Sequence, residues 1–257
     1  MAAFLTKGPA CASVALGHHP PPPMRRSRLV AAGAVFAATV PAAAAVVSAS
    51  ASDSSANSGA YSEGTEIAAP RRGTLALHAS PGTGRIVVRV GQRTAFGSPT
   101  RLAVVEDRDN WVAVVSDALG NGVEGYARAS AVQLSRKAWE LEADLSRRLL
   151  LVHRWGVVVR RVAVAIGGPS SPTPIGRFSV TDELSDFYPS VYGCCVLALS
   201  AHQTRLAKGW RGGDRVAIHG GGGIGSAVSN GCLHAGEADL HYLMATIPLG
   251  TLIVIHP

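Results

Sequence analysis

A cysteine near the C-terminal end stands where a thiol could react as a nucleophile. Cys232 follows Gly231 in the run Ser229-Asn230-Gly231-Cys232, downstream of a short apolar run that ends at His219. A cysteine attacks carbonyl carbon as the thiolate, so it needs a base, and histidine is the commonest base near neutral pH. The pattern predicts nucleophilic chemistry, with Cys232 as the nucleophile and His219 as the proton acceptor and donor.

Glycines surround both predicted catalytic residues. Gly231 permits a sharp turn and a close approach of substrate, so the backbone N–H groups of Gly231 and Cys232 are the predicted oxyanion donors. Gly220 to Gly223 follow His219 without any side chain beyond hydrogen. No Lys-Ser or Lys-Thr pair completes a phosphate-binding loop, which argues against a nucleotide site.

The elements that must position these residues are mostly strands. Residues 215–218 form an apolar strand that ends at His219, and 252–255 form a last buried strand. Alternation over 139–145 predicts a half-exposed strand, and two apolar runs around residues 153–156 predict a hairpin. Apolar residues at helical spacing over 237–247 predict one short helix, which Pro248 ends.

Together these motifs resemble the L,D-transpeptidases of the YkuD family. The resemblance rests on Ile218-His219-Gly220, on Ser229 to His234, and on the Thr-Pro-x-Gly-x-Phe run at 173–178, and it covers roughly residues 138–256. It implies an exported acyltransferase that cross-links peptidoglycan stem peptides through a cysteine. It further implies no cofactor and inhibition by carbapenem-type β-lactams.

The resemblance also implies which residues contact substrate, and the chain departs from the family there. The predicted contacts are Ser229, Gly220, His234 and Tyr192. Many relatives have His where this chain has Asn230, and Arg or Asn where it has His234. Internal hydrogen bonding of Ser229, and packing roles for His234 and Tyr192, stay open at this point.

Three alternatives to a transpeptidase stay open. Attack of water on the same acyl-enzyme would make the protein an L,D-carboxypeptidase or hydrolase, and loss of activity would leave a cell-wall-binding protein. A partial zinc site from Cys232, His234 and His219 lacks a paired C-x-x-C or H-x-x-x-H spacing. We therefore predict no metal. We expect the adjacent Cys194 and Cys195 to be buried packing residues rather than metal or redox groups.

Residues 71–136 read as a separate module of short strands. β-rich runs at 86–90, 102–105 and 111–115 are bounded by Gly, Ser, Asp and Asn, which predicts strands. Asn121-Gly122 is a strong turn signal. The order of these runs looks like a bacterial SH3-type barrel. The expected fold is therefore mainly β: a small SH3-like barrel followed by a YkuD-type β-sandwich catalytic domain with one or two short helices. Substrate positioning and simple packing both stay open as roles of the module.

The N-terminal part predicts export. Within the extension 1–51, residues 24–51 combine Arg25, Arg26 and Arg28 with an apolar run over 29–47 and small residues suited to cleavage. We predict a signal peptide, with a membrane anchor through 29–47 as the alternative and Met24 as an alternative start. Residues 52–70 read as a flexible linker, followed by the SH3-like module at 71–136 and the catalytic domain at 138–257.

Charge and composition agree with an envelope protein. The chain has 257 residues and a formal charge of +7, with 24 Lys and Arg spread along it. A basic protein suits an anionic partner such as a wall polymer. No basic run is interleaved with aromatic residues, so we predict no nucleic-acid binding. The acceptor residue of the cross-link is not encoded in any motif that we can read.

Overall fold

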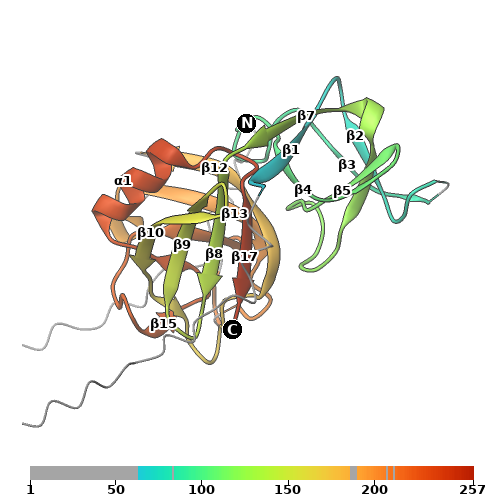
Figure 1. The fold of residues 1–257 in the computed structure, drawn as a ribbon. Coiled ribbons are helices and arrows are strands. Elements are labelled where there is room, and N and C mark those ends of the chain that lie inside the picture. The colour runs from blue at the N-terminus through green and yellow to red at the C-terminus, as the bar shows by residue number, and fades with distance from the viewer. Residues whose placement is uncertain (1–62, 83, 186–189, 207, 211) are drawn as a thin grey trace, which may run out of the picture. The chain divides into compact units, whose positions relative to one another are not determined.

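The chain is mainly β, as predicted, with strands curled into sheets and one α-helix in the part of the chain that is described (Figure 1). The computed structural model describes residues 63–82, 84–185, 190–206, 208–210 and 212–257. The predicted signal peptide or anchor lies outside these residues. None of the helices in the described ranges has the length and apolar character needed to cross a membrane.

The N-terminal sheet has seven strands among the described residues, in the order β3-β2-β6-β5-β4-β1-β7. Its strands are β1 (Thr65–Pro70), β2 (Leu75–His78), β3 (Ile86–Val90), β4 (Leu102–Arg108), β5 (Trp111–Val114), β6 (Gly125–Arg128) and β7 (Val132–Lys137), with the short helix η1 (Ala129–Ala131) before β7. Predicted strands at 86–90, 102–105 and 111–115 are confirmed. The likeness to an SH3 barrel stays a prediction.

The C-terminal sheet has eight strands in the described part of the chain, in the order β10-β9-β8-β17-β12-β13-β14-β16. They are β8 (Trp139–Asp144), β9 (Leu149–Arg154), β10 (Val157–Ala163), β12 (Gly176–Ser185), β13 (Cys195–His202), β14 (Arg215–His219), β16 (Leu233–His234) and β17 (Leu252–His256). A small parallel pair joins β11 (Ile166–Gly167) to β15 (Ala227–Ser229), and η2 (Ser190–Tyr192) precedes β13.

Each of the two sheets has its own apolar core. The core under the C-terminal sheet includes Phe178, Leu197 and Ile218, which are fully or almost fully buried. The helix α1 (Glu237–Thr246) packs on β13 and adds Leu240 and Leu243 to this core. The helix, the last strand and the hairpin around residues 153–156 are confirmed, although the second hairpin strand ends at Ala163.

One boundary was wrong. The predicted linker over 52–70 ends too late, because residues 65–70 form β1, with Ile67 and Ala68 buried. β1 lies between β4 and β7, so its backbone is hydrogen-bonded along both edges. Residues 65–70 are as rich in alanine as the residues before them, so composition did not indicate a strand. The strand forms through pairing with distant parts of the chain.

The half-exposed character predicted for 139–145 was also wrong, because the charged residues of β8 are buried. β8 lies between β9 and β17. The Glu142 carboxylate accepts hydrogen bonds from Nε2 of His153 and Nε2 of His256, each at 2.9 Å. These partners come from the two neighbouring strands. Burial lowers the pKa of His256, but the hydrogen bond and charge of Glu142 outweigh burial and raise it overall.

A buried arginine fixes the start of β14, the strand that carries His219. Nε of Arg215 donates to the Leu199 carbonyl at 2.8 Å, and Nη2 donates to Oγ1 of Thr181 at 2.6 Å. Nη1 pairs with Asp117 at 2.7 Å. A buried guanidinium is tolerated only when its donors are satisfied, so these contacts define where β14 begins.

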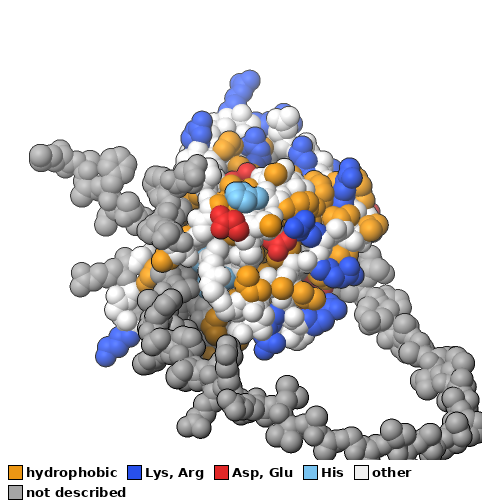
Figure 2. Space-filling model, turned by 90° about the vertical axis from the view of Figure 1, so that its left-hand side faces the viewer, with side chains coloured by type: hydrophobic (Ala, Val, Ile, Leu, Met, Phe, Trp, Pro, Cys, Tyr) orange, Lys and Arg blue, Asp and Glu red, His pale blue; other side chains and the backbone are white. Residues whose placement is uncertain are grey.

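Basic residues are dispersed on the visible surface. Figure 2 shows one face of the molecule, on which Lys and Arg side chains are scattered among hydrophobic and uncharged ones. They form no continuous basic stripe over the described residues of this face, unlike the faces that bind nucleic acid.

We predict that Glu140→Gln stabilises the protein, and increasingly so as pH rises. Burial raises the pKa of Glu140 to about 7 from an ordinary value of 4.5, although the Arg136 charge opposes the shift. Its Oε2 has no hydrogen-bond partner among the described residues. The folded protein therefore holds this proton more tightly than the unfolded chain, and stability falls as pH rises from about 4.5 to about 7.

Chemical denaturation across this window tests the prediction. Glutamine mimics the neutral acid, so the gain in unfolding free energy should be near zero at about pH 4.5 and about 1–3 kcal/mol at about pH 8. The substitution Asp107→Asn, at an exposed carboxylate, is the matched control and is expected to stay within about 0.5 kcal/mol. A pH-independent effect of Glu140→Gln would contradict the assignment.

Candidate active site

Cys232 lies in the turn between β15 and β16 and is fully buried. Its Sγ accepts a hydrogen bond from the backbone N–H of Ala217 in β14 at 3.2 Å. A donor aimed at sulfur stabilises the thiolate relative to the thiol. The structure records Cys232 as disulfide-bonded, so nucleophilic chemistry at this residue belongs to the reduced protein.

The strand register pairs His219 with His234, which lies two residues after Cys232. β14 and β16 are parallel, with Ile218 beside Leu233 and His219 beside His234. Cys232 is the residue before this register begins. His219 therefore ends one strand, and Cys232 directly precedes the strand that pairs with it.

The hydrogen bonds of His219 define its protonation. Nδ1 is hydrogen-bonded to the carbonyl of Gly220. A carbonyl only accepts, so Nδ1 carries the proton and Nε2 is the basic atom. Nε2 is buried without a hydrogen-bond partner among the described residues. Burial, and then the nearby His234, lower the pKa of His219 to about 3 from an ordinary 6.5. The imidazole is therefore neutral and able to accept a proton.

Tyr192 and His234 enclose the His219 ring. The Tyr192 ring meets it edge-on at a centroid distance of 4.9 Å, and the His234 ring lies at 4.7 Å. Nδ1 of His234 is hydrogen-bonded to the Gly222 carbonyl at 3.0 Å. Both rings are buried. The packing fixes the orientation of the His219 ring, and substrate contacts by Tyr192 and His234 stay predictions.

Two glycines allow the η2 segment to reach the base. The backbone N–H of Gly220 donates to the Tyr192 carbonyl at 2.7 Å. A Cβ built on Gly220 would lie 2.7 Å from Cα of Gly193, which is too close for any side chain at position 220. Gly220 thus serves the site through its backbone, in contact with both Tyr192 and His219.

Ser229 ties the cysteine turn together. Its Oγ donates to the Cys232 carbonyl at 2.6 Å and accepts from the Gly231 N–H at 3.0 Å. The internal hydrogen bonding considered for Ser229 is therefore present, and its hydroxyl is buried. The Gly231 N–H, a predicted oxyanion donor, is already engaged in this conformation.

Sequence reasoning missed Gln203, which clamps the same turn. Its Nε2 approaches three carbonyl oxygens, at 3.0 Å from Asn230, 3.0 Å from Pro172 and 3.3 Å from Ser171. A Cβ on Gly231, whose φ is +112°, would lie 2.0 Å from this nitrogen. A buried amide at the end of β13 carries no motif, and only the fold reveals its partners.

The packing prediction for Cys194 and Cys195 needs correction. Cys194 and Cys195 are bonded to each other in a disulfide, not merely packed. Among the described residues, the three-residue group with metal-ligand spacing is Cys194, Cys195 and His241. The zinc set considered from Cys232, His219 and His234 does not meet that spacing.

Comparison with known proteins gives one family. Residues 139–255 match the YkuD family model, described as the L,D-transpeptidase catalytic domain. No curated protein matches the chain.

Three of the solved structures that resemble the chain are described as L,D-transpeptidases. The L,D-transpeptidase from Mycobacterium smegmatis is 19% identical with a TM-score of 0.41, over 75% of this chain and 99% of that one. The Enterococcus faecium L,D-transpeptidase is 14% identical with a TM-score of 0.38, over 61% and 75%. L,D-transpeptidase 3 from Mycobacterium tuberculosis, in complex with a faropenem-derived adduct, is 15% identical with a TM-score of 0.39, over 51% and 66%.

The family match spans the domain that contains β14, the cysteine turn and the enclosed histidine. Residues 139–255 of this chain therefore match the L,D-transpeptidase catalytic domain of the YkuD family.

Proposed function

We propose that this protein is an exported L,D-transpeptidase that cross-links peptidoglycan through an acyl-enzyme on Cys232. The observation that carries the proposal is the state of His219 within the family-matched domain. It is a neutral imidazole with its proton on Nδ1 and its basic Nε2 without a described partner. The signal-like segment at 24–51 supports the export part of the proposal.

The first half-reaction forms a thioester. His219 accepts the proton of the reduced Cys232 thiol, and the sulfur attacks the carbonyl carbon that follows the L-centre of a tetrapeptide stem. The carbon–nitrogen bond breaks. Terminal D-alanine leaves as an amine that takes its proton from His219.

The second half-reaction restores the enzyme. An amine from a neighbouring stem gives a proton to His219 and attacks the thioester carbonyl. The carbon–sulfur bond breaks, a new peptide bond forms, and Cys232 regains its proton. The steps balance with groups of this chain and its substrates, so they require no cofactor.

Backbone donors stabilise the oxyanion in both steps. The Cys232 N–H lies beside the reacting sulfur, and the Gly231 N–H joins it once the Ser229 hydroxyl turns away. Gln203 holds the Asn230 carbonyl and so keeps the turn in place. Preorganised donors of this kind contribute about 3–4 kcal/mol each to acyl-transfer enzymes.

We expect one stoichiometric carbapenem adduct on the full chain after reduction, and none on Cys232→Ala. Intact-protein mass spectrometry measures both. The variant Cys194→Ser/Cys195→Ser is the matched control. It should still be acylated, because the two cysteines that it lacks lie outside the reacting turn. A folded, reduced protein that forms no adduct would remove the support for an active enzyme and favour a wall-binding protein.

We expect His219→Gln to slow acylation by roughly 10²–10⁴-fold, the usual contribution of general acid–base catalysis. The second-order rate of carbapenem acylation measures this loss. A stem tetrapeptide supplied with and without an acceptor amine then separates transpeptidation from hydrolysis. Release of D-alanine without cross-linked product would identify the carboxypeptidase alternative.

In a plot of acylation rate against pH, we expect the rate to fall on the acid side only well below the usual histidine pKa of 6.5. His219 is active when unprotonated, and its lowered pKa keeps it unprotonated at acidic pH. His234→Asn removes the neighbouring ring that helps to lower this pKa, so the fall in rate should move to higher pH. An unmoved fall near about pH 6.5 in both proteins would contradict this description of the base.

A further inference from the structure

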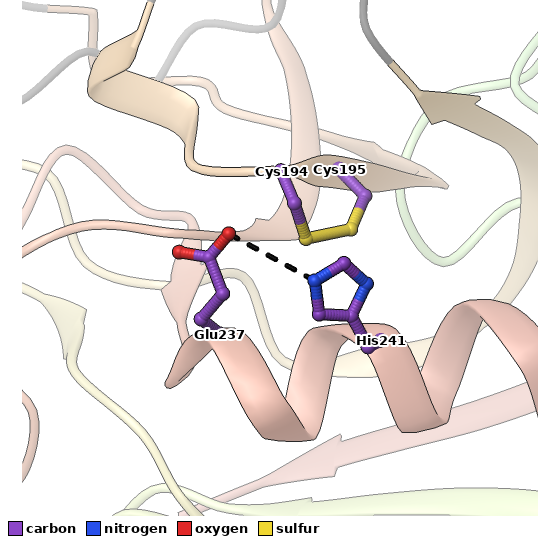
Figure 3. Close-up of a disulfide and its surroundings, with 4 residues drawn as sticks. All are labelled: Cys194, Cys195, Glu237 and His241. Carbon is purple, nitrogen blue, oxygen red and sulfur yellow. Dashed lines mark ion pairs between the residues drawn. A yellow bond between two sulfur atoms is a disulfide. The ribbon is translucent and has the colours of Figure 1, made fainter.

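The disulfide between Cys194 and Cys195 lies beside two metal-ligating side chains from the helix α1. Both sulfurs and a ring nitrogen of His241 lie within 4.8 Å of one another. Figure 3 shows Glu237 and His241 rising from the same side of the helix towards the disulfide. Their carboxylate oxygen and Nε2 are 3.9 Å apart.

From this cluster we infer a redox-gated metal site, in which reduced Cys194 and Cys195 bind a thiophilic divalent cation such as Zn²⁺ together with His241 and Glu237. The donor set is two thiolates, one imidazole and one carboxylate. These are the ligand types that zinc takes in proteins, four at a time and in tetrahedral geometry. The site is distinct from Cys232 and His219 and does not depend on the proposed function.

The chain spacing favours shared coordination. Glu237 and His241 are four residues apart on a helix, so both project from one face. In a tetrahedral zinc site, ligand atoms lie roughly 3.5 Å apart, given Zn–S near 2.3 Å and Zn–N near 2.0 Å. The two sulfurs and the His241 nitrogen, all within 4.8 Å of one another, are therefore close to ligation geometry once the sulfur–sulfur bond opens. Glu237 reaches this group through its 3.9 Å contact with His241.

Stability gives a poor account of this disulfide. A disulfide stabilises mainly by closing a loop of chain in the unfolded state, and the gain grows with loop length. Here the sequence separation is 1, so hardly any loop is closed. Likewise, the Glu237–His241 pair is an exposed ion pair, with each side chain 65% exposed, and such pairs contribute little.

A reductant can reach Cys194 more easily than Cys195. Cys194 is half-buried, whereas Cys195 is only 5% exposed. One thiolate of a dithiol reductant attacks Sγ of Cys194, and the sulfur–sulfur bond breaks with Cys195 leaving as the thiolate. The second thiol of the reductant then displaces Cys194, so the reductant becomes a disulfide. Zn²⁺ binding releases the remaining thiol protons.

Cobalt titration of the full chain tests the site. After reduction with a dithiol and anaerobic removal of the reductant, Co²⁺ should produce a thiolate charge-transfer band that one equivalent of Zn²⁺ removes. The untreated disulfide form should give no such band. The band should disappear in Cys194→Ser/Cys195→Ser. It should persist in Cys11→Ser/Cys232→Ser, which removes the other two cysteines of the chain.

The helix residues give the decisive variants, because exposed side chains can be changed without unfolding the protein. His241→Ala should weaken Zn²⁺ binding at least about tenfold, since even indirect partners of a metal contribute that much. Glu237→Gln should weaken it to a smaller extent, and His78→Ala should leave it unchanged. Equal Zn²⁺ affinity for wild type and His241→Ala, or equal binding by the disulfide form, would overturn the proposal.

Discussion

The hydrogen bond between Nδ1 of His219 and the Gly220 carbonyl is the constraint on which the site depends. It places the proton on one nitrogen and leaves the other basic. The bond lies at the end of a strand whose residues are all buried, so water does not compete for it. Tyr192 and His234 then hold the ring from its sides. The remainder of the C-terminal sheet serves to keep β14 in this position.

Buried polar groups carry much of that support. Arg215 begins β14 with its guanidinium bound to Leu199, Thr181 and Asp117. Gln203 holds the neighbouring turn through its amide. Each group would be unfavourable in the core if its partners were absent, because an unsatisfied buried donor costs about 1–3 kcal/mol. The same groups therefore fix the geometry of the site and make it sensitive to substitution.

Sequence patterns were sufficient to predict the helices and strands that depend on residues close together in the chain. The hairpin around residues 153–156, the helix that buries Leu240 and Leu243, and the strand that ends at His219 follow from alternation, helical spacing and breakers. The resemblance to the YkuD family also followed from short motifs, because the cysteine turn and the run at 173–178 agree with each other. The catalytic roles of Cys232 and His219 remain predictions from those motifs.

Features that depend on distant partners were not predictable. The carboxylates of β8 looked solvent-facing because His153 and His256, which satisfy Glu142, lie on strands that become neighbours only in the fold. β1 looked like a linker because β4 and β7, its pairing partners, come later in the chain. Gln203 had no motif, and a bond between Cys194 and Cys195 cannot be distinguished from packing by composition.

The contact between Gly193 and Gly220 has an evolutionary consequence. Cα of one glycine occupies the space that a Cβ on the other would need. Neither position can acquire a side chain without moving the backbone that carries the Tyr192 carbonyl away from Gly220. The two positions are thus coupled under selection: a homologue that replaces one glycine is expected to have rebuilt the whole approach of the η2 segment to the catalytic strand.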